Sequence, residues 1–257
     1  MNISEARNII VQFIADYVGN SGADGLVVGL SGGLDSSVSA ALAVEAIGAE
    51  RILAVILPCG STDPKSVEDA KKIAKHLGLE FVIYDIVEAV DVIASACDAT
   101  DNRIRYGNIA ARVRMIHLYD ISAELNRLVL GTGNRTEALL GYTTLWGDMA
   151  CAFTPLGGLL KTQERRLAEE IGLPKWIIEK APSAGLWRGQ TDEGELGITY
   201  EMADKILYAI FDLNKIPNEL VAEGFPQESV ELVLRLYQKS SFKRRMPVYP
   251  ELQGLPL

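Results

Sequence analysis

The sequence predicts an α/β fold in which a doubly wound parallel sheet carries helices on both faces. Short apolar runs of strand length alternate with amphipathic stretches of helix length. The apolar runs contain few polar residues, which is typical of strands that are buried on both faces. Glycine and proline stand between the runs, where turns are needed.

Four apolar runs predict the strands of this sheet, at residues 25–30, 51–57, 80–84 and 127–130. Gly48, Pro58 and Gly78 separate them from the neighbouring helical stretches. Because the strands alternate with helices, we expect them to be parallel, and we expect ligands beyond their carboxyl ends. This directs attention to residues 31–37, 58–62 and 131–137.

Apolar residues at helical spacing begin at the N-terminus with Ile3, Ile9, Ile10 and Phe13. Further helices are predicted at residues 35–47, 63–77, 86–97, 108–126, 161–171, 200–213 and 226–239. Residues 181–197 form a polar, glycine-containing stretch that we expect to be a mobile loop near the site. No boundary divides residues 1–257, so we expect a single domain with a helical C-terminal part.

The composition excludes several classes of protein. A net charge of -9 makes sequence-independent binding to nucleic acid improbable, because that binding needs a basic surface. Three cysteines predict neither a disulfide framework nor a metal site, and two histidines argue against a histidine-rich metal centre. No signal peptide or membrane span is visible, so we expect a cytoplasmic protein without a membrane partner.

The first predicted strand ends in a glycine- and serine-rich motif that opens a helix, and several interpretations compete. The motif could be a tight turn whose helix is capped by Asp35 or Ser36. It also fits the G-x-S-x-G pattern of a serine hydrolase, but no histidine follows His117. The third interpretation is a phosphate cradle, in which backbone N–H groups and the start of the helix bind an anion. No Lys-Ser/Thr pair follows, so it is not a Walker A loop.

Ser31-Gly32-Gly33-Leu34-Asp35-Ser36-Ser37 resembles the SGGxDS loop of the ATP pyrophosphatase superfamily, whose members cleave ATP between the α and β phosphates. Further blocks resemble the NAD synthetases within that superfamily. They are residues 107–115 (GNIAARVRM), 131–137 (GTGNRTE), 141–148, 155–162, 182–187 and 189–193. The resemblance covers about residues 2–250 and implies the adenine-nucleotide α-hydrolase-like fold.

The resemblance implies that a carboxylate, that of deamido-NAD, is adenylated by ATP and then attacked by ammonia. It places Asp35, Asp148 and Lys161 in the catalytic machinery, and Asp35 and Glu137 on Mg²⁺. Arg112 and Lys243 match positions on the acceptor side. The positions that match the ATP site are Gly29, Leu30, Ser31, Gly32, Gly33, Leu34, Asp35, Ser36, Thr132, Lys161 and Ser183.

Three positions depart from the family pattern on the acceptor side. Leu145 stands where the family has Lys, Ala152 where it has Asp, and Phe242 where it has His. The first two changes together remove a pair of charges without leaving one buried partner alone. They leave open a working NAD synthetase with an altered pocket, or a paralogue that amidates another carboxylate. A non-catalytic nucleotide-binding protein is a third hypothesis, but Asp35 and Glu137 are intact.

The resemblance also bears on partners. No ammonia-generating domain fits beside the synthetase in 257 residues, so we expect free ammonia or ammonia from another chain as the nitrogen source. Members of the family are homodimers, and the resemblance therefore implies a homodimer.

Overall fold

The computed structural model describes residues 2–183, 185, 190–248 and 250, and its sheet is parallel throughout. The strands are β1 (Gly25–Gly29), β2 (Ile52–Ile56), β3 (Glu80–Ile83) and β4 (Arg127–Leu130), in the order β3-β2-β1-β4. Val28 pairs with Ala54 on one side of β1, and Val27 with Val129 on the other. The four predicted strands and their parallel arrangement are confirmed.

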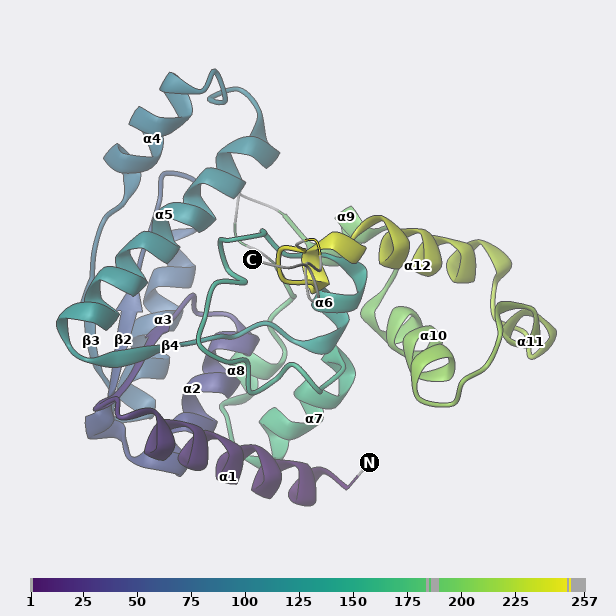
Figure 1. The fold of residues 1–257 in the computed structure, drawn as a ribbon, viewed down its shortest axis with the longest axis horizontal. Coiled ribbons are helices and arrows are strands. Elements are labelled where there is room, and N and C mark those ends of the chain that lie inside the picture. Colours follow the sequence, from purple (N-terminus) through teal and green to yellow (C-terminus); the bar gives the residue numbers. More distant parts are fainter. Residues whose placement is uncertain (1, 184, 186–189, 249, 251–257) are drawn as a thin grey trace, which may run out of the picture.

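Helices surround the sheet and continue beyond it (Figure 1). They are α1 (Ile3–Ser21), α2 (Leu34–Ile47), α3 (Pro64–His76), α4 (Val87–Ala96), α5 (Arg103–Glu124), α6 (Arg135–Leu140), α7 (Lys161–Glu170), α8 (Lys175–Ile178), α9 (Asp192–Leu196), α10 (Tyr200–Phe211), α11 (Pro217–Ala222) and α12 (Gln227–Lys239). No helix of the described residues is long and apolar enough to cross a membrane.

The two faces of the sheet are covered by different helices. Alternate residues of β1 and β2, such as Val28 and Ala54, join a core with α1, α2, α3, α7 and α8. The residues between them, such as Val27 and Val55, join a second core with α4 and α5. This alternation follows from the period of two in a strand, and it confirms the doubly wound architecture.

The C-terminal helices have a core of their own. Leu140 of α6, Ile206 and Leu207 of α10, Leu220 of α11 and Val233 of α12 are buried together. Figure 1 shows α10, α11 and α12 at the end of the molecule away from the sheet, with α6 and α7 between. The strand exits and this helical part therefore meet at α6 and α7.

Some elements differ from the prediction. Helix α5 begins five residues before the predicted start at 108, because the Asn102 side chain caps it by accepting from the Arg105 N–H. The short helices α6, α8 and α11 were not predicted. Residues 181–197 are not wholly a loop, since they contain α9, whose Leu196 is buried in the C-terminal core.

Candidate functional site at the strand exits

The loop between β1 and α2 folds around its own serines. Ser31 Oγ lies 3.0 Å from Ser36 Oγ and accepts from the Gly33 N–H at 3.2 Å, while Ser36 Oγ lies 3.2 Å from Gly33 O. The N-cap of α2 is Gly33, which makes no side-chain cap hydrogen bond. Neither Asp35 nor Ser36 therefore caps the helix, and the start of α2 keeps N–H groups for an anion.

Asp35 instead meets a buried lysine. Its Oδ2 accepts from Lys161 Nζ at 2.5 Å, and its Oδ1 accepts from Asn134 Nδ2 at 2.7 Å. Lys161 begins α7, 126 residues away, and also lies 3.2 Å from Glu164 Oε2. Burial acts to raise the pKa of Asp35, but the Lys161 charge outweighs it and the pKa is lowered. The predicted pair of Asp35 and Lys161 is thus brought together across the fold.

Glu137 stands beside this pair on α6. Its carboxylate accepts from the Asn134 N–H at 3.1 Å, which completes a capping box with the Asn134 side chain. Burial and then the negative charge of Asp35 raise the pKa of Glu137 well above its usual value. Three carboxylates, those of Asp35, Glu137 and Glu164, thus face the single ammonium of Lys161 in what we call the carboxylate–lysine cluster.

Lys161 keeps its charge in this setting. Burial acts to lower its pKa, but Asp35 and Glu164 outweigh burial and raise it above the usual value. A permanently charged ammonium at a strand exit can bind a polyphosphate oxygen. The cluster therefore has both a cation for phosphates and excess negative charge for a metal ion.

A second group of residues lies on the segment after α6. Asp148 accepts from the Thr144 N–H at 2.6 Å, and Thr144 Oγ1 donates to Asn108 Oδ1 at 2.8 Å. Asp148 as a whole residue is exposed, but burial of its carboxyl group raises the pKa of that group. Its charge also contributes to the raised pKa of Glu137. Asp148 therefore borders the carboxylate–lysine cluster.

Arg112 and Lys243, predicted on the acceptor side, both contact this segment. Arg112 on α5 donates to Leu145 O at 3.1 Å, and Lys243 Nζ donates to Gly141 O and Thr143 O at 2.8 and 2.6 Å. Burial lowers the pKa of Lys243, and the charge of Asp148 opposes that shift. Arg112 and Lys243 thus both lie against the segment that carries Asp148, and the charge of Lys243 reaches the Asp148 carboxyl.

Leu145 and Phe242 line one pocket of about 380 Å³ with Trp146 and residues 245–248. Phe242 is 59% exposed, and Trp146, Met246 and Val248 beside it in the lining are exposed as well. Ala152 is not among the lining residues. It packs beside the first core, and its carbonyl accepts from the Tyr17 hydroxyl at 3.1 Å.

Two residues predicted to bind ATP, Thr132 and Ser183, make no contact with the carboxylate–lysine cluster among the interactions described above. Thr132 lies two residues after the end of β4 and is partly exposed. Ser183 is exposed and accepts from the Gly185 N–H at 3.1 Å. Gly29, Leu30 and Leu34 belong to the backbone that carries the loop between β1 and α2. The rest of the predicted mobile stretch, residues 184 and 186–189, lies outside the described residues.

Sequence reasoning missed Glu164 and Lys180. Glu164 is fully buried, and its Oε1 has no hydrogen-bond partner among the residues that the structure describes. A charged residue within a helix is normally interpreted as part of a solvated face, so only its place one turn after Lys161 could have signalled it. Lys180 precedes the predicted mobile stretch and donates to Gly32 O at 2.8 Å.

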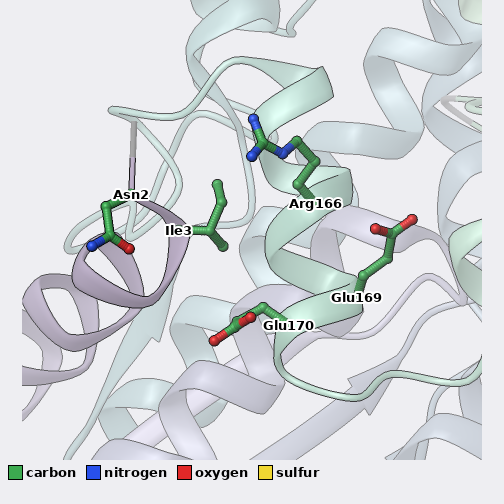
Figure 2. Close-up of a pocket in the computed structure, with 5 residues that line it drawn as sticks. All are labelled: Asn2, Ile3, Arg166, Glu169 and Glu170. Carbon is green, nitrogen blue, oxygen red and sulfur yellow. The ribbon is translucent and has the colours of Figure 1, made fainter.

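A polar pocket of about 510 Å³ lies apart from these residues (Figure 2). It is lined by Asn2 and Ile3 at the start of α1 and by Arg166, Glu169 and Glu170 of α7. Ser4 ties the two helices together by donating to Glu170 Oε1 at 2.6 Å. None of these residues belongs to the predicted site.

Glu164→Gln is expected to stabilise the ligand-free protein more at pH 8 than at pH 5. Burial, and then the charge of Asp35, raise the pKa of Glu164 well above its usual value. A raised pKa in the folded state gives stability that is complete below the unfolded pKa, about 4.5, and is lost as the pH rises through the folded value. Each unit of the shift removes about 1.4 kcal/mol at higher pH.

Chemical denaturation of both proteins between pH 5 and pH 8 measures this difference. Glu231→Gln, on the exposed face of α12, is the control and should show no such trend. A stability difference for Glu164→Gln that stays constant with pH would contradict the burial of an ionisable Glu164.

The parallel sheet and the site at its strand exits define an α/β protein of the adenine-nucleotide α-hydrolase-like class. The family described as NAD synthase matches residues 6–247. The chain belongs to the NAD synthase family.

Individual relatives agree with this assignment. The NH(3)-dependent NAD(+) synthetase of Trichlorobacter lovleyi is 45% identical over 99% of this chain and 93% of its own length. The NH3-dependent NAD synthetase of Campylobacter jejuni, solved with a nitrate ion, is 33% identical, with a TM-score of 0.83 over 98% of this chain and 100% of its own. The NMN synthetase of Francisella tularensis is 32% identical, with a TM-score of 0.86 and the same coverage. The expected family, fold and ligase class are confirmed.

Proposed function

We propose that the protein is an ammonia-dependent ligase that uses ATP to amidate the carboxylate of deamido-NAD. The observation that carries this proposal is the Asp35–Lys161 pair, which lies beside the loop between β1 and the N-terminus of α2. Membership of the NAD synthase family supports the reaction. The NH(3)-dependent relatives support ammonia as the nitrogen source.

The residues divide the reaction between two neighbouring groups. The loop from Ser31 to Ser36 and the ammonium of Lys161 would bind the phosphates while a carboxylate oxygen attacks the α phosphorus and pyrophosphate leaves. Ammonia then attacks the acyl carbon and AMP leaves with the bond electrons. Asp148, whose carboxyl has a raised pKa, would hold ammonium and accept a proton from it.

The residues present fit a divalent cation. The carboxyl groups of Asp35, Glu137 and Glu164 outnumber the one ammonium of Lys161, and burial and the Asp35 charge raise the pKa of Glu137. A divalent cation would remove this repulsion, with Asp35 and Glu137 holding it as carboxylates. Within the described part of the chain no group of three or more His, Cys, Asp and Glu side chains could hold a metal alone. Mg²⁺ is typically bound by one or two protein carboxylates together with the phosphate oxygens of a nucleotide. Bound there, Mg²⁺ would offset the charge that builds on departing pyrophosphate.

A second candidate acceptor is a different carboxylate. Leu145 and Phe242, two of the three departures from the family pattern, line the same apolar pocket beside Asp148 and Lys243. A relative of the same fold is named as an NMN synthetase, which supports variation of the acceptor in this fold.

An acceptor screen with ATP, Mg²⁺ and ammonium tests the proposal. Pyrophosphate release together with NAD formation from deamido-NAD is the expected result. Release with another carboxylate only would favour the second candidate. ATP binding without release for any carboxylate would leave a non-catalytic nucleotide-binding protein and would overturn the enzyme proposal.

Leu145→Lys combined with Ala152→Asp is expected to raise kcat/KM for deamido-NAD about tenfold or more. The pair restores the charged residues that the family pattern has at these two positions, and a hydrogen bond to a charged group contributes about 1.5–3 kcal/mol. Steady-state kinetics measure the change, and a melting curve confirms that the partly buried Ala152 position accepts the carboxylate. Leu145→Met is the matched control. Unchanged or lower turnover would indicate a remodelled pocket.

Residues 1–257 are proposed to act as one domain within a cytoplasmic homodimer. Ile104, Ile116 and Tyr119 of α5 are exposed, which supports a covered surface in the assembled protein. Light scattering of the purified protein measures its oligomeric state, and a monomer at all concentrations would contradict the dimer.

A further inference from the structure

Lys180, which follows α8 in the chain, forms hydrogen bonds to the loop between β1 and α2 and to helix α3. Its ammonium donates to Gly32 O at 2.8 Å, to Asp69 Oδ2 at 2.8 Å and to Ser66 Oγ at 3.4 Å. Asp69 is only 2% exposed on α3, so its carboxylate is a buried anchor for the lysine. The contacts hold the loop against α3.

The backbone at Gly32 is in the left-handed region and packs closely on α3. Its φ is +73°, and a Cβ there would lie 2.2 Å from Ser66 O. At Gly32 the loop therefore lies in close contact with α3, and the Lys180 ammonium donates to the carbonyl of the same residue.

The direction of one peptide group follows from this contact. In a trans peptide the C=O and the next N–H point to opposite sides of the chain. Because Gly32 O points to Lys180, the Gly33 N–H points the other way, where it donates to Ser31 Oγ inside the loop. That N–H belongs to the N-cap residue of α2, at the end of the helix that favours an anion, and a phosphate oxygen there would replace Ser31 Oγ as its acceptor.

We propose that Lys180 is a positioning residue that aims the Gly33 N–H at the ATP phosphates by fixing the Gly32 carbonyl, with Asp69 as its anchor. This rests on the proposed ATP site. The competing role is direct binding of Lys180 to a phosphate. The structure favours positioning, because the ammonium already has a carboxylate, a carbonyl and a hydroxyl as partners.

Calorimetry of ATP and of pyrophosphate binding with Mg²⁺, for the full chain, tests the proposal. Lys180→Met is expected to raise both dissociation constants about tenfold, the scale of a hydrogen bond to a charged group. Lys180→Arg, which keeps donors, should restore most of the affinity. Lys72→Met is the matched control, because Lys72 lies 3.9 Å from the other Asp69 oxygen and, among the described residues, makes no hydrogen bond to Gly32. It should bind like the wild type.

Asp69→Asn separates positioning from direct contact. If Lys180 positions the loop, this variant also weakens binding, and the double variant with Lys180→Met is no weaker than Lys180→Met alone. If Lys180 binds phosphate directly, freeing it from Asp69 leaves affinity unchanged or higher, and that result overturns the proposal. Wild-type affinity in Lys180→Met overturns it as well, even if Asp69→Asn does not fold.

Kinetics separate this role from a purely structural one. Positioning predicts a higher KM for ATP with an unchanged KM for the acceptor. Because Lys180→Met removes the close cation of the buried Asp69 carboxylate, its melting temperature should fall, and the kinetics are measured at a temperature where both proteins are folded. A general loss of structure would instead affect both substrates. The calorimetry measures nucleotide binding without an acceptor. A protein that failed to amidate deamido-NAD would therefore still show whether Lys180 affects ATP binding.

Discussion

Asp35→Asn is expected to reduce pyrophosphate release about a thousandfold, the scale on which loss of one preorganised electrostatic group slows catalysis. Both oxygens of Asp35 accept from donors, Lys161 Nζ and Asn134 Nδ2. A carboxamide must turn its NH₂ toward one of these donors whichever way it lies. The variant therefore loses a metal ligand and also disturbs Lys161, which keeps only Glu164 as a close anionic partner.

A coupled assay for pyrophosphate measures this loss over a range of Mg²⁺ concentrations. Asp16→Asn on α1 is the control, since Asp16 is exposed and accepts from the Gln12 side chain one turn earlier on the same helix, at 2.8 Å. We expect the control to retain full activity. Substantial activity of Asp35→Asn would remove Asp35 from the proposed metal role.

The strand exits were predictable because glycine, proline and apolar runs act locally. Strands β1 to β4 begin and end within one residue of their predicted bounds, and β4 matches its prediction. The SGGxDS motif placed Asp35, and the block at residues 131–137 placed Glu137. Both lie on helices that follow strands of one sheet, so the parallel topology brings them together.

The missed features depend on contacts between distant segments. Helix α6 has six residues, too few for a periodic pattern, and its start is the same Asn134–Glu137 capping box that marks the metal position. Glu164 has the sequence context of a surface residue, and it is buried because α7 packs against helices from distant parts of the chain. Lys180 meets Gly32 across 148 residues, a contact that no local pattern specifies.

Gly32→Ala is expected to lower the free energy of unfolding by about 3 kcal/mol and to abolish measurable ATP binding. A left-handed conformation costs alanine about 1–2 kcal/mol, and overpacking adds about 1–3 kcal/mol. The new Cβ would lie 2.2 Å from Ser66 O and 2.8 Å from the Ala70 N, which are backbone atoms of α3. Because backbone atoms of a helix cannot rotate away as a side chain can, the loop must move away from α3.

Gly22→Ala separates the two costs. Gly22 has a φ of +75°, close to the +73° of Gly32, but a Cβ there meets nothing within 4 Å. It should therefore show only the conformational cost and bind ATP normally. The difference between the two variants in denaturant unfolding measures the close approach of the loop to α3. If Gly32→Ala matched Gly22→Ala in both stability and ATP affinity, the close contact of the loop with α3 would not be required for phosphate binding. The direction of the Gly33 N–H would then have to be set by the serines of the loop alone.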